Sequence, residues 1–393
     1  MPRTALVARM REFGTTIFAE MSALATATGA INLGQGFPDT DGPDAVLDAA
    51  VDALRGGRNQ YAPGPGVPEL RHAVAEHQRR VYGFDPDPDT EVLITAGATE
   101  ALTAAIMALC EPGDEVLCFE PYYDSYAAAI ALAGAVRRPV TLRAPVEPGG
   151  RYTFDPDELR AAVGPRTTLL LLNSPHNPTG MVLTRDELAT IAAVCREHDL
   201  VAVTDEVYEH LVFTDAAAGG HVSLAQLPGM AERTLQVSSA GKTFSVTGWK
   251  VGWVCGPAEL VAAVTRVKQF LTYTNAAPLQ PAVAVGLGLG DGYFTAFRDG
   301  LQARRDQLCA GLAEAGFTVF RPEGTYFVTC DIRPLGGTDG LEFCRSLPAR
   351  CGVVAVPTQV FYDDVEAGRH LVRFAFCKRP EVLAEAVTRL RTL

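Results

Sequence analysis

Short apolar runs alternate with longer helical patterns between about residues 41 and 289. The runs are rich in leucine and β-branched residues, and intervening stretches such as 185–198 repeat apolar residues at helical spacing. Continuous apolar strands separated by helices are typical of a mostly parallel sheet that helices cover on both faces. The pattern therefore predicts an α/β fold. The expected strands are 91–97, 114–120, 167–173, 200–206 and 234–239.

The pattern changes after Pro278. A long helical stretch at 292–316 leads into two strands within 317–332 that a Pro-Glu-Gly turn connects. Further strands at 352–357 and 370–378 and a terminal helix at 381–393 complete an α+β pattern, which predicts a second, smaller domain. The first forty residues show little periodicity, and we expect them to form an arm that packs on this domain. The expected division is an arm at 1–40, a large domain at 41–285 and a small domain at 286–393.

Composition narrows the class of protein. The 393 residues carry a formal net charge of -12, which argues against nucleic acid and anionic membrane surfaces because both require a basic face. No apolar run reaches the ~18 residues of a membrane span, and the N-terminal residues lack the apolar core of a signal peptide. The nine cysteines are scattered without Cys-x-x-Cys spacing, which favours buried free thiols and argues against a metal cluster. We expect a cytoplasmic protein.

The first candidate site follows the strand expected at 91–97. Gly97, Ala98 and Thr99 begin a helix there, and the backbone N–H groups of a helix N-terminus, with a hydroxyl beside them, suit a phosphate group. An ordinary turn in which Thr99 caps the helix explains the same residues.

Asp205 ends a strongly apolar strand, so its carboxylate is expected to be buried. A buried carboxylate needs a cationic partner or several hydrogen bonds, because otherwise its pKa rises and it stays protonated. A capping or structural role remains open. Tyr208 follows three residues later and is able to reach the same pocket, although a packing role explains it equally well.

Two loops after buried strands carry unusual amounts of polar or aromatic chemistry. Two prolines and a glycine fix the loop 173–180, and Asn173, His176 and Asn177 give it more amide chemistry than a structural turn requires. His176 is also explained as a hydrogen-bonding loop residue. The segment 120–126 contains three tyrosines. Such rings usually pack in the core or at its rim, and the alternative is that one of them stacks on a flat cofactor.

Two of the four lysines in the chain lie in the window 238–253. Lys242 follows a strand and is flanked by small residues, which leaves room for a large group to approach its amine. Catalytic lysines form imines with carbonyl groups, which requires a lowered pKa in a crowded, partly cationic site. Lys250 is close enough in sequence to lower that pKa and to bind an anion. Most lysines, in contrast, are solvated surface residues.

Eight segments together resemble the fold-type I pyridoxal 5′-phosphate enzymes, specifically the class I and II aminotransferases. Within that family they are most similar to the kynurenine, glutamine and methionine aminotransferase branch and to actinobacterial N-succinyldiaminopimelate aminotransferase-like proteins. The resemblance covers nearly the whole chain and implies a large domain with a mostly parallel seven-stranded sheet. The segments are 32–39, 59–71, 96–102, 120–126, 173–180, 204–213, 238–253 and 371–378.

The resemblance implies a role for each residue around the cofactor ring. Lys242 matches the lysine that binds pyridoxal 5′-phosphate covalently and moves a proton during catalysis. Asp205 matches the carboxylate that keeps the pyridinium nitrogen protonated, so that the ring acts as an electron sink. Tyr208 and Asn177 match the groups that hydrogen-bond the ring oxygen O3′. Tyr123 matches the aromatic side chain that stacks on the ring.

The phosphate group and the substrate have their own matching residues. Arg373 matches the bidentate clamp for the substrate α-carboxylate, with backbone contact from Gly36 and a further contact from Asn177. One segment departs from the family pattern, because Thr274 and Asn275 occupy positions where aromatic or histidine residues reach the partner's site. We expect them to contact substrate, and their small size implies a roomier or more polar pocket or a different fate of the substrate carbanion. Neutral drift at a subunit interface is the alternative. The residues that match ligands of the cofactor phosphate are Gly97, Ala98, Thr99, Ser239 and Lys250. Tyr61 is expected to reach the phosphate bound in the neighbouring subunit.

The implied activity moves an amino group from an L-amino acid to a 2-oxo acid in two half-reactions. The implied donors are aromatic amino acids, methionine, glutamine or larger acidic amino acids, and the implied assembly is a homodimer with active sites at the subunit interface. A second hypothesis keeps the cofactor but assigns elimination or replacement at Cβ or Cγ, for example on a sulfonium amino acid such as S-adenosylmethionine. A non-catalytic cofactor-binding descendant is the third, and the presence of both Lys242 and Arg373 argues against it.

Overall fold

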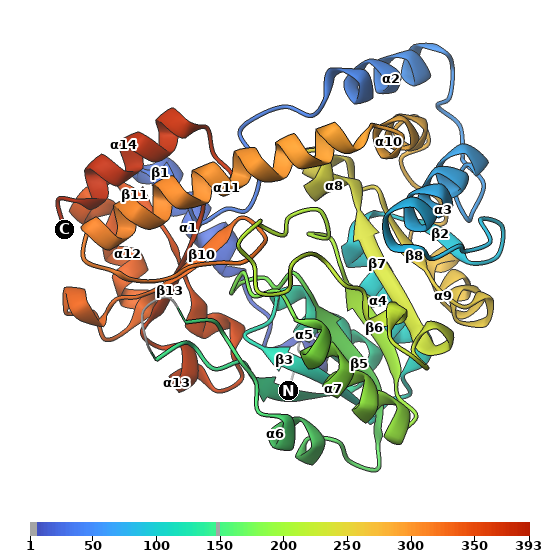
Figure 1. The fold of residues 1–393 in the computed structure, drawn as a ribbon, viewed down its shortest axis with the longest axis horizontal. Helices are drawn as coiled ribbons and strands as arrows, with labels where there is room; N and C mark the ends of the chain where they lie inside the picture. The colour runs from blue at the N-terminus through green and yellow to red at the C-terminus, as the bar shows by residue number, and fades with distance from the viewer. Residues whose placement is uncertain (1–5, 147–149) are drawn as a thin grey trace.

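A seven-stranded sheet forms the centre of the large part of the chain (Figure 1). The computed structural model describes residues 6–146 and 150–393, so residues 1–5 of the expected arm lie outside the described residues. The strand order is β2-β8-β7-β6-β5-β3-β4, and all neighbours are parallel except those of β8. The predicted α/β class and mostly parallel sheet are confirmed. The strands are β2 (Val92–Thr95), β3 (Glu115–Glu120), β4 (Val136–Thr141), β5 (Thr167–Asn173), β6 (Val201–Asp205), β7 (Thr234–Ser239) and β8 (Gly252–Cys255).

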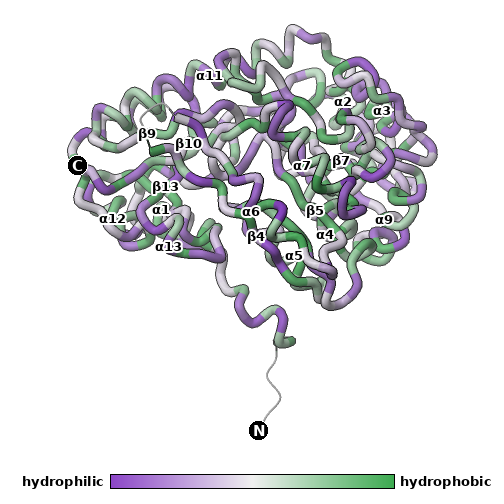
Figure 2. Tube along the Cα trace, turned by 60° about the horizontal axis from the view of Figure 1, so that its bottom comes forward, coloured by the Kyte–Doolittle hydropathy of each residue, from purple (hydrophilic) through white to green (hydrophobic). Residues whose placement is uncertain are grey.

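Both faces of this sheet are buried. Leu169 and Leu171 of β5 belong to an apolar cluster with α4 (Gly97–Leu109), α5 (Asp124–Ala133) and α9 (Ala258–Leu271). Leu170 and Leu172 point to the opposite face, where they belong to a cluster with α6 (Pro156–Ala161) and α7 (Arg185–Glu197). Successive residues of a strand point to opposite faces. This double burial explains why the strand sequences are continuous apolar runs, which appear as hydrophobic segments in the interior in Figure 2.

Three helices cover the edge of the sheet formed by β2 and β8. Leu70 and Val74 of α3 (Pro68–Tyr82) and Val283 of α10 (Gln280–Leu287) form an apolar cluster with Ile94 and Trp253 of these strands. Helix α2 (Asp44–Arg55) packs against α10. These contacts make α3 and the edge strands one packed unit.

The C-terminal part holds a second, four-stranded antiparallel sheet in the order β12-β13-β10-β9. The long helix α11 runs from the edge of the large sheet to this smaller layer (Figure 1). The N-terminal strand β1 pairs in parallel with β11, and α1 contacts α12. The bounds are α1 (Ile17–Thr28), β1 (Ile31–Asn32), α11 (Asp291–Glu314), β9 (Thr318–Phe320), β10 (Phe327–Asp331), α12 (Gly340–Cys351), β11 (Val353–Val354), β12 (Val356–Pro357), α13 (Val365–Gly368), β13 (Leu371–Ala375) and α14 (Pro380–Leu390).

The sequence expectations fail at a few short elements. All five expected strands of the large sheet are confirmed, but β4 and β8 were not expected. Strand β4 is an edge strand that contains two arginines and a proline, and β8 has only four residues, of which the first is a glycine. Helix α1 was also missed, because only two of its twelve residues are fully buried and its sequence is weakly amphipathic. The single strand expected at 352–357 is divided between β11 and β12, which belong to different sheets.

The nine cysteines are all buried and free, as expected. No helix among the described residues is long and apolar enough to cross a membrane.

Two glycines of α11 provide a test of the packing between α11 and α14. A Cβ at Gly311 would overlap the methyl groups of Val387, whereas a Cβ at Gly300 would meet nothing within 4 Å. We therefore expect Gly311→Ala to lower the free energy of unfolding by about 1–3 kcal/mol through overpacking. Gly300→Ala should raise it by about 0.5–1 kcal/mol because alanine favours the helix. Denaturant unfolding of both variants measures this difference, and equal effects would contradict the packing described here.

Candidate active site

The carboxyl ends of the central parallel strands open onto one cavity of about 340 Å³. Asn173 pairs in register with Asp205 at the ends of β5 and β6, and Ser239 ends β7 beside them. Ligands of open parallel sheets bind at this edge. Every site residue expected from the sequence lines the cavity except Tyr61, Thr274 and Asn275. The residues in the cavity are Gly36, Gly97, Ala98, Thr99, Tyr123, Asn177, Asp205, Tyr208, Ser239, Lys242, Lys250 and Arg373.

Lys242 and Lys250 reach the same cavity because the chain leaves the edge of the sheet and returns to it. After β7, the short helix α8 (Ala240–Thr243) carries Lys242. The chain then turns through residues 247–249 and enters β8, which runs antiparallel to β7. Lys250 therefore lies at the start of β8, at the edge where β7 ends. It adopts a left-handed φ of 52°, and its Nζ lies 3.4 Å from Thr99 Oγ1.

The N-terminus of α4, Lys250 and Ser239 surround one end of the cavity. Gly252 pairs with both Ser239 and Thr95, and a Cβ at Gly252 would approach the backbone of Gly97 to 2.7 Å. The close approach brings the α4 N-terminus against the start of β8. Thr99 is the third residue of α4, and no side chain caps the helix. Backbone N–H groups, hydroxyls and an ammonium group directed at one point suit a phosphate.

Lys242 lies partly buried at the centre of the cavity. Burial is the main cause that lowers the pKa of its amine to about 8. The cations Arg373 and Lys250 contribute to this lowering, and Cys377 and Asp205 oppose it. Its Nζ makes one long hydrogen bond, at 3.4 Å, to the carbonyl oxygen of Gly36. The amine is therefore able to lose its proton near neutral pH and react with a carbonyl carbon.

Asp205 lies on the cavity wall with little to balance its charge. Burial raises the pKa of its carboxyl group to about 6, although Tyr126 Oη donates a hydrogen bond at 2.6 Å and the Val207 N–H donates another at 3.3 Å. Among the described residues, no basic side chain lies within ion-pair distance of it. A ligand with a positively charged N–H would stabilise the carboxylate in this position.

Asn177 and Asn173 connect the 173–180 loop to the rest of the cavity. Asn173 donates to the backbone oxygen of Asp205 at 2.8 Å and accepts from the Asn177 N–H at 2.8 Å. The Asn177 side chain accepts from Arg373 through Oδ1, which leaves its NH₂ group for a ligand. His176 bonds Thr179 inside the loop, and its burial lowers its pKa to about 3. It does not line the cavity.

Arg373 projects from β13 of the small sheet into the same cavity. It donates to Asn177 Oδ1 at 2.8 Å and to the Gly34 carbonyl at 2.9 Å, while its buried Nε has no hydrogen-bond partner. Its guanidinium group lies 3.9 Å from the centre of the Phe327 ring. Burial lowers its pKa to about 10, and no carboxylate of the described residues pairs with it. A buried guanidinium group with an unused donor fits a carboxylate ligand.

Tyr208 and Tyr123 form aromatic walls of the cavity. Tyr208 is buried and contacts Tyr326 edge to face at 5.2 Å between ring centres, and burial raises the pKa of its hydroxyl. Tyr123 contacts Tyr126 at 5.8 Å in the same geometry, and burial raises its pKa to about 12. Both phenols therefore stay protonated at neutral pH and remain able to donate hydrogen bonds.

The three remaining expected residues lie outside the cavity. Asn275 donates to the backbone oxygens of Thr95 and Lys250 at 3.0 and 3.1 Å, so it connects the end of β2 with Lys250, which lies just before β8. The Oγ1 of Thr274 is buried without a hydrogen-bond partner. Tyr61 is 82% exposed. Their expected roles stay predictions.

Sequence reasoning did not assign three residues that the structure brings to the site. Tyr126 was noted only as one of three tyrosines, although its spacing of three from Tyr123 on a helix places both on one face. Thr247 lines the cavity near Lys250. It lies in a turn, where no hydrophobic periodicity of the sequence indicates which side chains face the cavity. Tyr326 donates to the Gly36 carbonyl at 2.5 Å, a contact between distant segments that local sequence patterns do not contain.

The charge of the cavity is opposite to that of the chain. Lys242, Lys250 and Arg373 are the basic side chains of its lining, and Asp205 is the acidic one, although the whole chain carries -12. An anionic phosphate and a carboxylate would balance the excess, and a protonated ring nitrogen would pair with Asp205. These donors fit pyridoxal 5′-phosphate and an amino acid, and together with the sheet they define a fold-type I pyridoxal-phosphate enzyme.

Comparisons with known proteins agree with that class. The family model described as "Aminotransferase class I and II" matches residues 28–390. A probable N-succinyldiaminopimelate aminotransferase of Mycobacterium tuberculosis is 55% identical over 98% of both chains. The solved structure of an N-succinyldiaminopimelate aminotransferase from that organism is 56% identical, with a TM-score of 0.95 over 98% of this chain and 99% of the other. The methionine aminotransferase of Escherichia coli is 41% identical, over 98% of this chain and 97% of its own.

The chain therefore belongs to the class I and II aminotransferase family. Members of the family use pyridoxal 5′-phosphate, and the activity is transamination between amino acids and 2-oxo acids. The relatives do not favour the alternative of elimination or replacement.

Removing the hydroxyl of Tyr126 tests the environment of Asp205. We expect Tyr126→Phe to raise the pKa of Asp205 above about 6 and to weaken cofactor binding roughly 10- to 100-fold, because a hydrogen bond to a charged group contributes about 1.5–3 kcal/mol. Titration of the cofactor-free protein with pyridoxal 5′-phosphate measures the affinity. Tyr122→Phe is the control, since that hydroxyl donates to Asp363 at 2.5 Å. Equal losses in both variants would contradict the assignment.

Proposed function

We propose that the cavity residues hold pyridoxal 5′-phosphate in one orientation. The helix N-terminus at Gly97–Thr99, with Ser239 and Lys250, binds the phosphate group. Asp205 pairs with the ring nitrogen, Tyr208 and Asn177 donate to the ring oxygen, and Tyr123 covers the ring. The observation that carries the proposal is that a reactive lysine, a buried unpaired carboxylate and a buried unpaired guanidinium group line one cavity.

In this proposal Arg373 orients the amino acid and Lys242 moves the proton. When bound, the cofactor supplies a carbonyl carbon and an electron sink. Arg373 binds the substrate α-carboxylate, which places Cα near Lys242. Because its pKa is about 8, the Lys242 amine is partly neutral at pH 7, so it would take the proton from the substrate Cα and pass it to the carbonyl carbon that the cofactor supplies. The Gly36 carbonyl, which Tyr326 also bonds, holds Lys242 in position.

A larger acidic amino acid is the donor that we propose. A second cavity of about 630 Å³ adjoins the first, and Phe18 and Tyr123 line both. The second cavity contains Arg345, which pairs with Glu20 at 2.7 Å. Its volume suits a long side chain, and the most similar relative named above acts on a succinylated diamino acid according to its name. Methionine, glutamine and aromatic amino acids are the alternative donors.

A homodimer is the proposed assembly. Tyr61, Phe270 and Tyr273 are more than half exposed, and the rings of Tyr61 and Tyr273 contact each other at 5.5 Å. Exposed aromatic side chains at one place favour a protein interface. In a dimer, Tyr61 would reach the phosphate in the partner's site. We also propose a cytoplasmic location and a division into an arm at 1–40, a large domain at 41–285 and a small domain at 286–393.

A panel of amino donors tests the proposed function. The protein is incubated with one 2-oxo acid and with N-succinyldiaminopimelate, methionine, glutamine, kynurenine or S-adenosylmethionine. Transamination forms the new amino acid and the new 2-oxo acid in equal amounts, with the highest kcat/KM expected for the succinylated donor. Release of a sulfur leaving group without an equal amount of new amino acid would contradict transamination.

Arg373 gives a sharper test of substrate orientation. We expect Arg373→Gln to lower kcat/KM roughly 100-fold or more for donor and acceptor alike, because a buried charged hydrogen-bond partner contributes about 2–5 kcal/mol. Cofactor affinity should stay near that of the parent. Arg333→Gln is the control, since Arg333 is exposed and pairs with Asp331 in the same sheet. Unchanged kcat/KM in Arg373→Gln would overturn the proposed clamp.

A further inference from the structure

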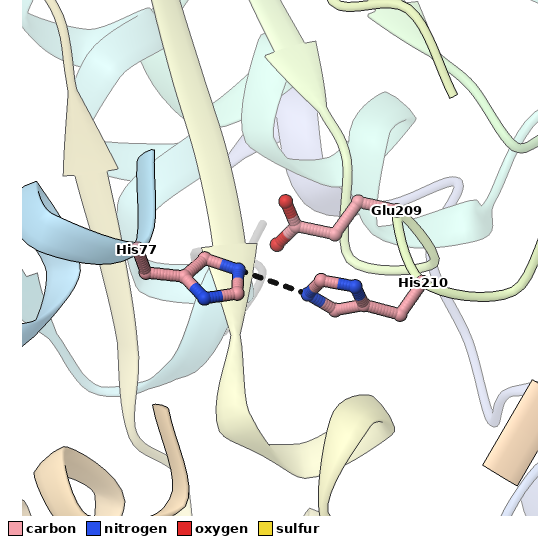
Figure 3. Close-up of side chains that lie close together, drawn as sticks. All are labelled: His77, Glu209 and His210. Atoms are coloured by element: carbon pink, nitrogen blue, oxygen red, sulfur yellow. Dashed lines mark hydrogen bonds between the residues drawn. The ribbon is translucent and has the colours of Figure 1, made fainter. Parts of the chain in front are cut away.

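A buried cluster of two histidines and a glutamate lies outside the active site. His77 of α3, Glu209 and His210 place one potential ligand atom each within 4.8 Å of one another (Figure 3). His77 and Glu209 are buried, and His210 is half-buried. The Nε2 atoms of the two histidines face each other at 3.0 Å. None of the three residues lines the catalytic cavity.

We propose that His77, Glu209 and His210 bind a divalent transition metal ion of the Zn²⁺ class. Two imidazole nitrogens and a carboxylate are a common three-ligand set for zinc, with water in the fourth position. The two nitrogens already face each other between α3 and the turn after β6 (Figure 3). Tetrahedral zinc with bonds of about 2.0–2.1 Å separates its ligands by roughly 3.3 Å. The two histidine nitrogens, 3.0 Å apart, therefore have to separate slightly, and the Glu209 carboxylate has to lie at a similar distance from both.

The surroundings of the three side chains favour a cation. Both imidazoles lie beside the buried Glu209 carboxylate, and a carboxylate supplies an anionic ligand for a metal ion. Ser238 Oγ donates to Glu209 Oε1 at 2.5 Å, which is the type of outer hydrogen bond that orients a carboxylate ligand. The neighbouring Glu206 is buried as well and adds negative charge beside His221.

Arg80 is the group that opposes metal binding. Its Nη2 lies 3.4 Å from His77 Nδ1, and because arginine only donates, this contact places the proton of His77 on Nε2. Binding a metal through Nε2 moves that proton to Nδ1 and ends the contact. Arg80 keeps its bonds to Asp291 at 2.6 Å and to the Leu287 carbonyl at 3.2 Å.

A bound ion would connect two elements that the catalytic site depends on. Glu209 and His210 directly follow Tyr208, and Ser238 directly precedes Ser239. The ion would tie this turn to α3, which packs against the β2 edge of the large sheet.

Metal binding to the cofactor-loaded protein tests the proposal. The protein is cleared of metal with a chelator and titrated with Zn²⁺ against a competing dye, and with Co²⁺ to record its visible ligand-field bands. We expect one tightly bound Zn²⁺ per chain and Co²⁺ bands of tetrahedral intensity. Absence of both in the parent protein overturns the proposal without any variant.

Matched variants locate the ion. His77→Gln should weaken Zn²⁺ binding by more than about 100-fold, since even outer partners contribute roughly 10- to 100-fold. His72→Gln is the control, because His72 lies exposed on the same helix. Arg80→Met should strengthen binding by about tenfold, the size of one hydrogen-bond contribution. Equal affinities of His77→Gln and His72→Gln, with both folded by circular dichroism, overturn the proposal.

Discussion

The register of strands at the carboxyl edge of the large sheet determines where Asp205, Lys242 and Lys250 lie in the catalytic cavity. Asn173, Asp205 and Ser239 end adjacent parallel strands, and β8 returns antiparallel to the same edge. Lys242 follows β7, and Lys250 precedes β8. A shift of one residue in β7 or β8 would turn these side chains to another face. The packing of both sheet faces, through alternating leucines on β5, fixes this register.

Burial of charge is the second constraint, because the ionisable side chains of the cavity make fewer hydrogen bonds or ion pairs than they are able to form. Asp205 has hydrogen bonds without an ion pair, Arg373 has an unused donor, and Lys242 has one long hydrogen bond. Isolated buried charges are costly. A ligand with a cationic nitrogen, an anionic phosphate and a carboxylate would remove these costs together, which gives the cavity its affinity for a cofactor and an amino acid.

The fold was predictable from the sequence because the signals of its strands are local, whereas cavity residues such as Gly36 and Arg373 were expected only from the family resemblance. Buried strands such as Thr167–Asn173 are continuous apolar runs, and the polar side chains after them follow directly. Short or edge elements such as β4 and β8 lack that signal. Contacts between distant segments, such as Tyr126 with Asp205 or Tyr326 with Gly36, depend on how α5 and β10 pack, which no local pattern records. The histidine cluster joins residues 77 and 210 for the same reason.

The identity of the reactive lysine is the central claim, and covalent trapping tests it most directly. Of the four lysines, Lys268 donates to the carbonyls of Gly64 and Tyr273, and Lys378 donates to that of Phe37. Borohydride reduction of the cofactor-loaded protein, followed by peptide mass spectrometry, identifies the lysine that bears the cofactor. We predict a single modified residue, Lys242. Modification of Lys250, Lys268 or Lys378 in its place would contradict the account.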